Sequence, residues 1–124
     1  MKDFRSLRVW EKSHKLTLDI YRVTSSFPRE ETYGLTSQMR RSSASIGANI
    51  AEGCGKRGNN EFRRFLQIAS GSASELDYHL LLARDLGFLP DNDFREFGDD
   101  LLELRKMLTS LLQKVGSERS LAKC

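Results

Sequence analysis

The stretch FRRFLQIASGSASELDYHLLLA, residues 62–83, decides the fold of this 124-residue chain. Its apolar residues recur at alternating steps of four and three, which places them in one row along an α-helix. The row consists of Phe62, Leu66, Ala69, Ala73, Leu76, Leu80 and Ala83. The alanines indicate a partner helix that comes close, and Gly71, which costs a helix interior about 1 kcal/mol, predicts another close contact. We expect this helix to begin at an N-cap on Asn59 or Asn60 and to end before Gly87.

Residues 94–115 carry a second row with the same spacing. The row consists of Phe94, Phe97, Leu101, Leu104, Leu108, Leu111 and Val115. Asp91 or Asn92 is a suitable N-cap for the helix that carries it. The periodicity ends with this row, so we expect one domain over residues 1–115 and a flexible tail over residues 116–124.

Two apolar rows nearer the N-terminus predict a helix over residues 6–25. One row passes through Val9, Ser13, Leu16, Ile20, Val23 and Phe27, and the other through Leu7, Trp10, Thr17 and Tyr21. Two rows give a stripe wide enough to pack against two neighbouring helices. Pro28 disfavours α geometry in the residue before it, which ends this helix.

The remaining helix is expected to begin between Pro28 and Thr32 and to run to Glu52. Its large apolar residues are few, and small residues stand between them. These are Ser42, Ser43, Ala44, Ser45, Gly47 and Ala48. Serine and glycine are poor helix formers, so tertiary packing must stabilise this helix. Small side chains let a neighbouring helix approach closely, and we interpret residues 42–53 as such a seam, followed by a connection at 53–58.

Four amphipathic helices with short connections predict an all-α fold, an up-down-up-down antiparallel four-helix bundle. Hydrophobic residues at 39% and charged residues at 30% are typical of a soluble globular protein. No segment approaches the roughly 20 apolar residues of a membrane span, and the N-terminal residues do not resemble a signal peptide. The two cysteines, Cys54 and Cys124, do not form the pattern of a disulfide framework. We therefore expect a cytoplasmic location.

The glycines of the connection match the dinucleotide-binding fingerprint literally, as Gly53-x-Gly55-x-x-Gly58. That fingerprint requires a preceding strand and a βαβ unit, whereas a helix is predicted before it here. We therefore interpret these glycines as a flexible turn between helices. A weaker alternative stays open, in which the amides of the turn, with Lys56 and Arg57, hold a phosphate of a polymer.

Patterns of catalytic and metal-binding residues are incomplete in this sequence. A di-metal site in a bundle needs two Glu-x-x-His pairs, and only Glu11 with His14 has that spacing, since His79 follows Glu75 by four residues. We expect both histidines at the surface or the bundle edge. Cys54 lies in a basic turn, but the sequence places no histidine near it. The sequence therefore predicts no enzyme activity, no cofactor and no metal site.

Basic residues gather between positions 40 and 64 of a chain whose net charge is +3. They are Arg40, Arg41, Lys56, Arg57, Arg63 and Arg64. We hypothesise that they contact the phosphate backbone of nucleic acid, in a salt-sensitive and weakly sequence-specific manner. The alternative is a solvated face on which these cations pair with Glu52 and Glu61. Arg40 lies about three helical turns from the connection, so the six residues need not form one patch.

The segment SIGANIAEG, residues 45–53, carries the most specific motif of a resemblance that spans nearly the whole chain. Further matching residues are Glu31, Gly34, Leu35, Gln38, Arg40, Arg41, Phe62, Phe65, Leu66, Ala69, Ser72, Glu75 and Leu76. Segment 4–10 and the turn 87–89 match as well. The chain resembles a bacterial four-helix-bundle family encoded in intervening sequences of 23S ribosomal RNA genes.

The resemblance implies a four-helix bundle and assembly into a homopentameric ring, as similar proteins form. A distant relative, the accessory protein of diversity-generating retroelements, binds a reverse transcriptase and nucleic acid through a basic surface. No catalytic residue can be carried over from this family. The resulting hypothesis is a non-enzymatic homo-oligomeric bundle that binds structured or ribosomal RNA through the six basic residues. The alternative is a protein-interaction scaffold without direct nucleic-acid binding.

Overall fold

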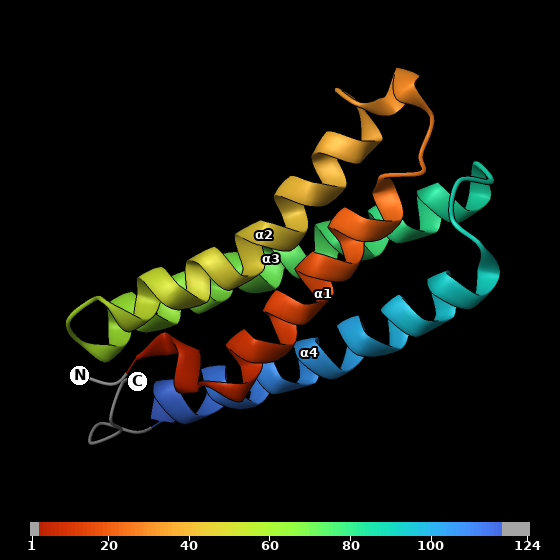
Figure 1. The fold of residues 1–124 in the computed structure, drawn as a ribbon. Helices are drawn as coiled ribbons and strands as arrows, with labels where there is room; N and C mark the ends of the chain where they lie inside the picture. Colours follow the sequence, from red (N-terminus) through yellow and green to blue (C-terminus); the bar gives the residue numbers. More distant parts are fainter. Residues whose placement is uncertain (1–2, 118–124) are drawn as a thin grey trace.

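The computed structural model describes residues 3–117 and shows an all-α fold (Figure 1). Its α-helices are α1 (Arg8–Thr24), α2 (Leu35–Cys54), α3 (Asn59–Asp85) and α4 (Asp91–Ser117). Two short 3-10 helices, η1 (Phe4–Ser6) and η2 (Arg29–Glu31), precede α1 and α2. No strand occurs among residues 3–117, and the predicted fold class is confirmed.

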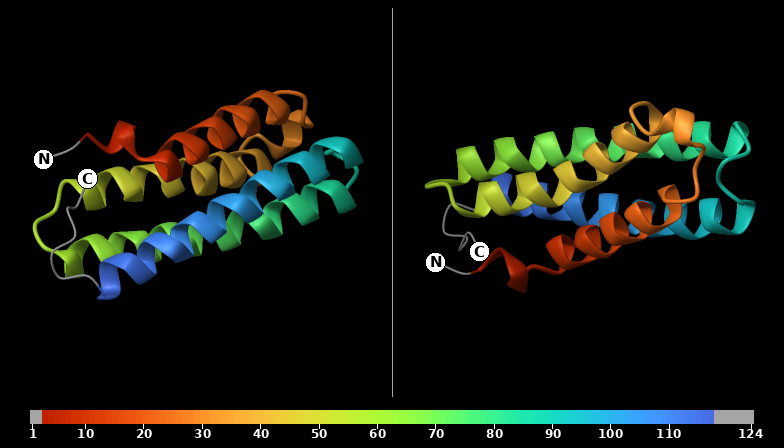
Figure 2. Two further views of the ribbon diagram at one scale, coloured as in Figure 1. Left: turned by 90° about the horizontal axis from the view of Figure 1, so that it is seen from below. Right: turned by 45° about the horizontal axis from the view of Figure 1, so that its top comes forward.

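The helices run alternately up and down the bundle (Figures 1 and 2). The hairpin of α2 and α3 has the most extensive interface, α4 packs mainly on α3, and α1 packs on α2 and less extensively on α4. The α2–α3 turn therefore shares one end of the bundle with the N-terminal end of α1 and the C-terminal end of α4 (Figure 1).

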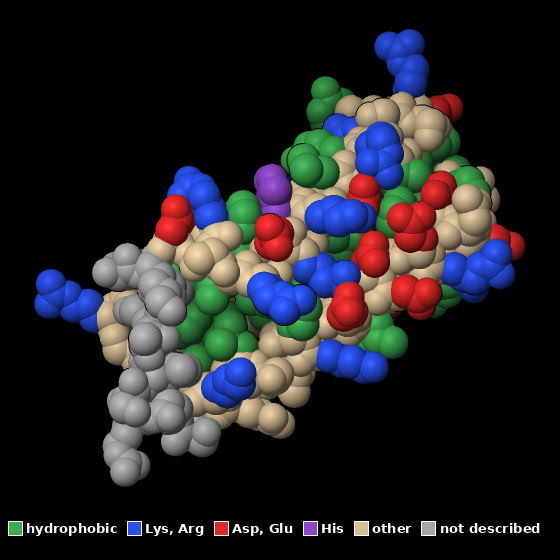
Figure 3. Space-filling model, turned by 60° about the horizontal axis from the view of Figure 1, so that its bottom comes forward, with side chains coloured by type: hydrophobic (Ala, Val, Ile, Leu, Met, Phe, Trp, Pro, Cys, Tyr) green, Lys and Arg blue, Asp and Glu red, His purple; other side chains and the backbone are tan. Residues whose placement is uncertain are grey.

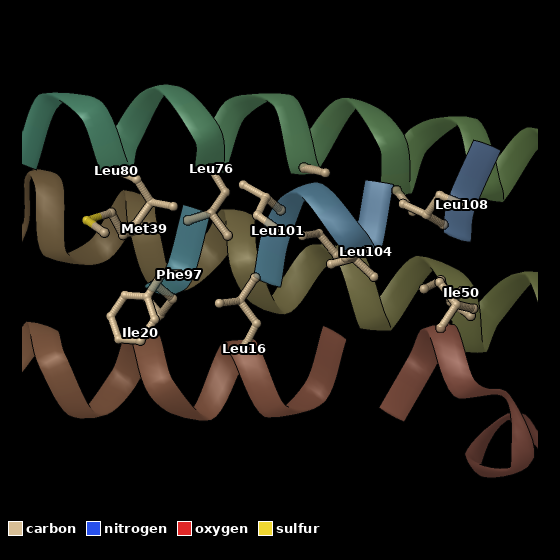
Figure 4. Packing of buried hydrophobic residues seen from close by; sticks show 14 of the residues in the cluster. Leu16, Ile20, Met39, Ile50, Leu76, Leu80, Phe97, Leu101, Leu104 and Leu108 are labelled. Atoms are coloured by element: carbon tan, nitrogen blue, oxygen red, sulfur yellow. The ribbon is translucent and has the colours of Figure 1, made fainter. Parts of the chain in front are cut away.

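The core lies between the four helices and contains the predicted rows of α3 and α4 (Figure 4). Every residue of the α3 row, from Phe62 to Ala83, is exposed by 2% or less. The α4 row is buried at Phe97, Leu101, Leu104, Leu108 and Val115, while Phe94 and Leu111 are half-buried. Burial of each large side chain contributes about 1.5–3 kcal/mol, so these two rows are a major source of the bundle's stability.

Helix α2 begins at Leu35, later than the predicted start between Pro28 and Thr32. Pro28 has a ψ of 143°, and the chain makes the 3-10 turn η2 before the helix starts. The Glu31 carboxylate then accepts a hydrogen bond from the Leu35 amide at 3.0 Å. The first helical turn leaves its amides without backbone partners, so Glu31 caps α2 from outside instead of lying within it.

Close approaches at two glycines show the predicted seam on α2. A methyl group at Gly47 would lie 2.9 Å from the Ser13 hydroxyl of α1, and one at Gly53 would lie 2.9 Å from the Phe62 ring of α3. Packing against α3 leaves no room for a side chain at Gly53, and this residue lies inside the helix. Helix α2 ends at Cys54, close to the predicted end at about Glu52.

Gly71 does not make the close contact that its position in α3 predicts. A Cβ atom there would meet no described atom within 4 Å, and the residue is exposed. The prediction is wrong within one chain, because Gly71 faces away from the core row of α3. Packing within one protomer therefore does not explain why this residue is glycine.

The two ends of α3 are set by glycines in the left-handed region. Gly58, at φ 81°, occupies the N-cap position that the sequence had suggested for Asn59 or Asn60. Gly87, at φ 82°, donates its amide to the Arg84 carbonyl oxygen at 2.9 Å, as a C′ residue does. The predicted end of α3 is confirmed.

Helix α4 extends slightly beyond the predicted domain. It ends at Ser117, whereas the apolar row ends at 115. Residues 118–124, which make up most of the predicted tail, lie outside the described residues. Within residues 3–117, none of the helices is long and apolar enough to cross a membrane.

Candidate nucleic-acid interface

Arg40 is held at the C-terminal end of α1. Its Nε donates a hydrogen bond to Thr24 Oγ1 at 2.8 Å, and its Nη2 donates to the Tyr21 carbonyl oxygen at 3.1 Å. The guanidinium also lies over the Tyr21 ring, 4.7 Å from the centroid. The last carbonyl groups of a helix lack backbone donors and attract a cation. Arg40 is half-buried and links α2 to the end of α1.

Arg63 links α3 to the end of α4 in the same way. Its Nη1 donates a hydrogen bond to the Leu112 carbonyl oxygen at 2.6 Å, and its guanidinium lies against Gly116. The residue is half-buried. Two of the six predicted contact residues, Arg40 and Arg63, are therefore engaged in contacts between helices.

Three other predicted residues surround the α2–α3 turn. Lys56 Nζ lies 5.4 Å and Arg64 Cζ 4.6 Å from the centroid of the same Phe65 ring. Arg57 lies between them in the sequence and is exposed. The structure thus brings Lys56, Arg57 and Arg64 together at one end of the bundle.

Acidic neighbours offset part of this charge, as the alternative interpretation expected. Lys56 Nζ lies 3.9 Å from Glu52 Oε2, and Arg64 Nε lies 3.2 Å from Glu61 Oε1. Such pairs in solvent contribute between about 0 and 1 kcal/mol, so they leave both cations available to a stronger anion. Among the described residues, Arg57 has no hydrogen bond or ion pair.

Arg41 lies apart from the turn, on α2. It precedes Cys54 by thirteen positions, which corresponds to about 20 Å of helix. It borders a groove of about 540 Å³ on the outer side of α2, and its side chain is exposed. The six predicted residues therefore do not form one patch.

The antiparallel topology adds cations that the sequence analysis missed. Arg5 lies in η1, Arg8 begins α1 and Lys114 lies in the last turns of α4, so all three belong to the end that carries the α2–α3 turn (Figure 1). All three are exposed, and Arg5 is paired with Asp3. The up-down order alone would have predicted this grouping. We call the set Arg5, Arg8, Lys56, Arg57, Arg64 and Lys114 the basic end.

The face formed by α1 and α4 has a different character. Acidic and basic side chains alternate over its middle (Figure 3). Lys12 Nζ lies 3.7 Å from Asp100 Oδ1 and also pairs with Glu103, and its hydrogen bond to Glu103 lowers the pKa of that carboxyl. The hydrogen bond between Lys15 and Asp19, 3.0 Å long, raises the pKa of Lys15. The pair of Lys15 with Asp19 lies within α1, whereas the Lys12 pairs and the approach of Lys15 Nζ to Asp100 Oδ2, 3.9 Å, join α1 to α4.

A cluster of three carboxylates on this face has the spacing of metal ligands. Oxygen atoms of Asp19, Glu96 and Asp100 lie within 4.8 Å of one another. However, Asp19 accepts hydrogen bonds from Lys15 at 3.0 Å and from Arg22 at 2.8 Å. Protein cations therefore already bind the Asp19 carboxylate, and Lys15 Nζ also lies 3.9 Å from Asp100 Oδ2, so we assign Asp19 and Asp100 to the ion-pair network.

One histidine matches its expected position, whereas the other histidine and Cys54 correct two smaller expectations. His14 is exposed, as expected, and stacks on Trp10 with the ring centroids 4.9 Å apart. His79 is not at the surface: it is 4% exposed, and its Nδ1 lies 3.2 Å from Ser42 Oγ. Burial lowers the pKa of His79, and the Glu75 carboxylate partly opposes this shift. Cys54 is buried and disulfide-bonded, which the sequence analysis did not expect; Cys124 lies outside the described residues.

Fold and surface together define a four-helix-bundle protein with basic side chains gathered at one end. Residues 5–110 match the family described as 23S rRNA-intervening sequence protein. The match covers most of the chain, and the chain belongs to this family. The resemblance seen in the sequence is thereby confirmed.

A solved structure supports the same assignment. It is described as a protein with unknown function from the S23 ribosomal protein family of Bacteroides thetaiotaomicron. The two proteins share 27% sequence identity and a TM-score of 0.76, over 85% of this chain and 98% of the other. A search of curated proteins found no match. The family is therefore established, and the function needs its own argument.

Proposed function

We propose that this protein is a non-enzymatic bundle that binds structured or ribosomal RNA through its basic end. The observation that carries the proposal is the position of Lys56 and Arg64 around one Phe65 ring, with Arg57 exposed beside them. Phosphate groups attract such cations without reading the base sequence. The family description mentions 23S rRNA, and we take ribosomal RNA as the first ligand to test.

Binding measured over a salt series tests this proposal. The logarithm of the association constant should fall linearly with the logarithm of salt concentration, by about 0.7–0.9 per phosphate contacted. Arg57→Glu should weaken binding and make the slope shallower. Arg95→Glu is the matched control, because Arg95 is exposed at the start of α4, near the opposite end of the bundle. A slope near zero, or equal effects of the two variants, contradicts the proposal.

The proposal includes assembly of several copies, which the family resemblance suggests to be five. Support comes from the outer face of α3, where Ile68, Tyr78 and Leu81 are exposed by 41%, 60% and 39%. Gly71 lies on the same helix with open space around it, although glycine disfavours a helix interior. A neighbouring subunit packed on this face would explain both features, since small residues allow helices to approach.

Light scattering on the purified protein measures this assembly. We expect the mass of an oligomer, and we expect Tyr78→Glu to reduce it because a charge is buried poorly in an apolar contact. Tyr33→Glu is the matched control, since Tyr33 is 96% exposed in the connection before α2. A monomer at micromolar concentration contradicts the assembly but leaves RNA binding open.

The second candidate function is a protein-interaction scaffold, and the same exposed side chains on the outer face of α3 favour it. In that case Ile68, Tyr78 and Leu81 contact a different protein, and the basic end maintains solubility. The two functions differ in one measurement. A scaffold shows no salt-dependent RNA binding, whatever its state of assembly.

A further inference from the structure

The groove beside Arg41 has the size and chemistry of a binding site. It measures about 540 Å³, which lies within the range of small-molecule sites. Ala44 and Ala48 line it, and larger side chains at these positions would fill it. Tyr21 of α1 and Ser72 of α3 form other parts of its wall. The small residues on the outer side of α2 therefore leave a hollow.

Two arginines give this groove a positive wall. Arg41 is exposed and has no hydrogen bond or ion pair among the described residues. Arg40 is fixed by the bonds of its Nε and Nη2, while its Nη1 has no hydrogen-bond partner among the described residues. Glu75 is the acidic residue of the lining. An anion in the groove would find one fixed and one adaptable guanidinium.

An aromatic ring and a pair of hydroxyl groups complete the lining. Tyr21 is 43% exposed and carries the Arg40 guanidinium 4.7 Å from its ring centroid. Ser45 Oγ and Ser72 Oγ lie 2.8 Å apart, and Asn49 Nδ2 donates to Ser45 Oγ at 3.0 Å. The pair uses one of its two hydroxyl protons, so the other can be donated to a ligand oxygen.

We propose that this groove binds one nucleotide of single-stranded RNA, with the base on the face of the Tyr21 ring opposite the Arg40 guanidinium and the phosphate on Arg41. The arginines select an anion, and an exposed ring beside a guanidinium stacks on any base. A double helix does not fit this chemistry, because its bases are stacked on one another and its sugars and phosphates face outward. The hydroxyl proton that the Ser45–Ser72 pair does not use can be donated to a sugar or base oxygen. This inference rests on the proposed RNA-binding function and gives it a second contact, about 20 Å along α2 from the basic end.

Two pairs of variants test the groove. Fluorescence anisotropy measures the binding of a ten-nucleotide single-stranded RNA, an abasic strand of equal length and an RNA hairpin. Loss of one stacked base should weaken binding of the single strand about 5- to 150-fold in Tyr21→Leu. Tyr21→Phe should keep the wild-type affinity, and Tyr33→Leu is the control. Arg41→Glu should weaken binding of the single strand and of the abasic strand, unlike its control Arg95→Glu.

The possible results test the proposed groove site separately from the proposed RNA-binding function. Wild-type affinity in both Tyr21→Leu and Arg41→Glu, with weak binding in Arg57→Glu, overturns the groove and leaves the function standing. The groove site is also overturned if Tyr21→Leu weakens binding of the abasic strand as much as binding of the single-stranded RNA. Such a loss of affinity does not come from base stacking. A change of molecular mass in Arg41→Glu with unchanged RNA affinity shows that another subunit covers the groove and overturns it. Absence of salt-dependent binding by the wild type overturns both. Melting followed by circular dichroism confirms that each variant is folded.

Discussion

Ser13 and His79 are two of the polar residues buried in the bundle, and they differ in how well their polar atoms are satisfied. Ser13 is 1% exposed, and its Oγ has no hydrogen-bond partner among the described residues. His79 is 4% exposed but lies beside Ser42 Oγ. A buried polar atom without a partner costs about 1–3 kcal/mol, so the two residues should respond differently to substitution.

Replacement of Ser13 tests this cost directly. Ser13→Ala removes the unsatisfied hydroxyl and should raise the free energy of unfolding by about 1 kcal/mol. Ser43→Ala is the matched control, since the buried Ser43 hydroxyl donates to the Arg40 carbonyl oxygen at 3.1 Å and its loss should destabilise. Urea denaturation measures both. Equal destabilisation by the two variants would show that Ser13 is satisfied in solution.

His79 should make stability depend on pH. Burial lowers its pKa in the folded chain below the ordinary value of 6.5, so the unfolded chain binds a proton more readily. Linkage then requires stability to be complete above about pH 6.5 and to fall as the pH decreases below it. Urea denaturation between pH 5.5 and 7.5 measures this slope. His79→Gln should remove most of it, whereas His14→Gln should keep it because His14 is exposed; equal slopes in both variants would contradict the argument.

At the scale of the helices, two glycines with the same local propensity have opposite surroundings. Gly53→Ala adds a methyl group 2.9 Å from the Phe62 ring and 3.0 Å from Phe65 Cβ, which should destabilise the protein by about 1–3 kcal/mol. Gly71→Ala adds one where no described atom lies within 4 Å, and should stabilise the isolated protomer by up to about 1 kcal/mol. Thermal unfolding measures both. Similar effects at the two sites would mean that propensity, and not packing, controls them.

The helices were largely predictable because their apolar rows are regular, and the errors at their ends occur where a side-chain contact competes with a local rule. Glu31 and Gly53 show this. The predicted start between Pro28 and Thr32 places Glu31 in the first turn of α2. Its carboxylate instead caps the helix from outside, because α2 starts four residues later. Gly53 reads as a turn residue, but the α3 aromatic rings require its small size. The Glu31 contact spans four residues and the Gly53 contact joins two helices, and the period of the apolar residues signals neither of them.

At the scale of the whole molecule, topology decides which cations can act together. Arg40 and Arg63 belong to the basic stretch of the sequence, yet each bonds a carbonyl oxygen near the end of another helix. Such bonds join residues 19 and 49 positions apart and have no local signature. Conversely, Arg5 and Lys114 lie far apart in the sequence and share the basic end. The candidate site was therefore predictable only in part, at Lys56, Arg57 and Arg64.

The unequal size of the helix interfaces sets the order in which the bundle opens. The interface between α1 and α4 is the least extensive of the neighbouring helix pairs, and ion pairs of Lys12 and Lys15 with α4 contribute to it. The Lys12 side chain is 22% exposed and that of Lys15 is 64% exposed, so dissolved salt can screen these pairs. Local opening draws on the weakest interface first. We therefore expect α1 to separate from α4 before α2 separates from α3.

Amide hydrogen exchange at two salt concentrations tests this order. Exchange in α1 should be faster at 1 M than at 50 mM sodium chloride, while exchange in the middle of α3 should change little. Lys12→Gln removes the pairs with Asp100 and Glu103, so it should speed exchange in α1 at low salt and reduce the salt effect. Lys114→Gln is the matched control, since Lys114 lies on α4 and has no ion pair among the described residues. Equal acceleration in α1 and α3, or an unchanged salt effect in Lys12→Gln, would show that apolar contacts alone hold α1 in place.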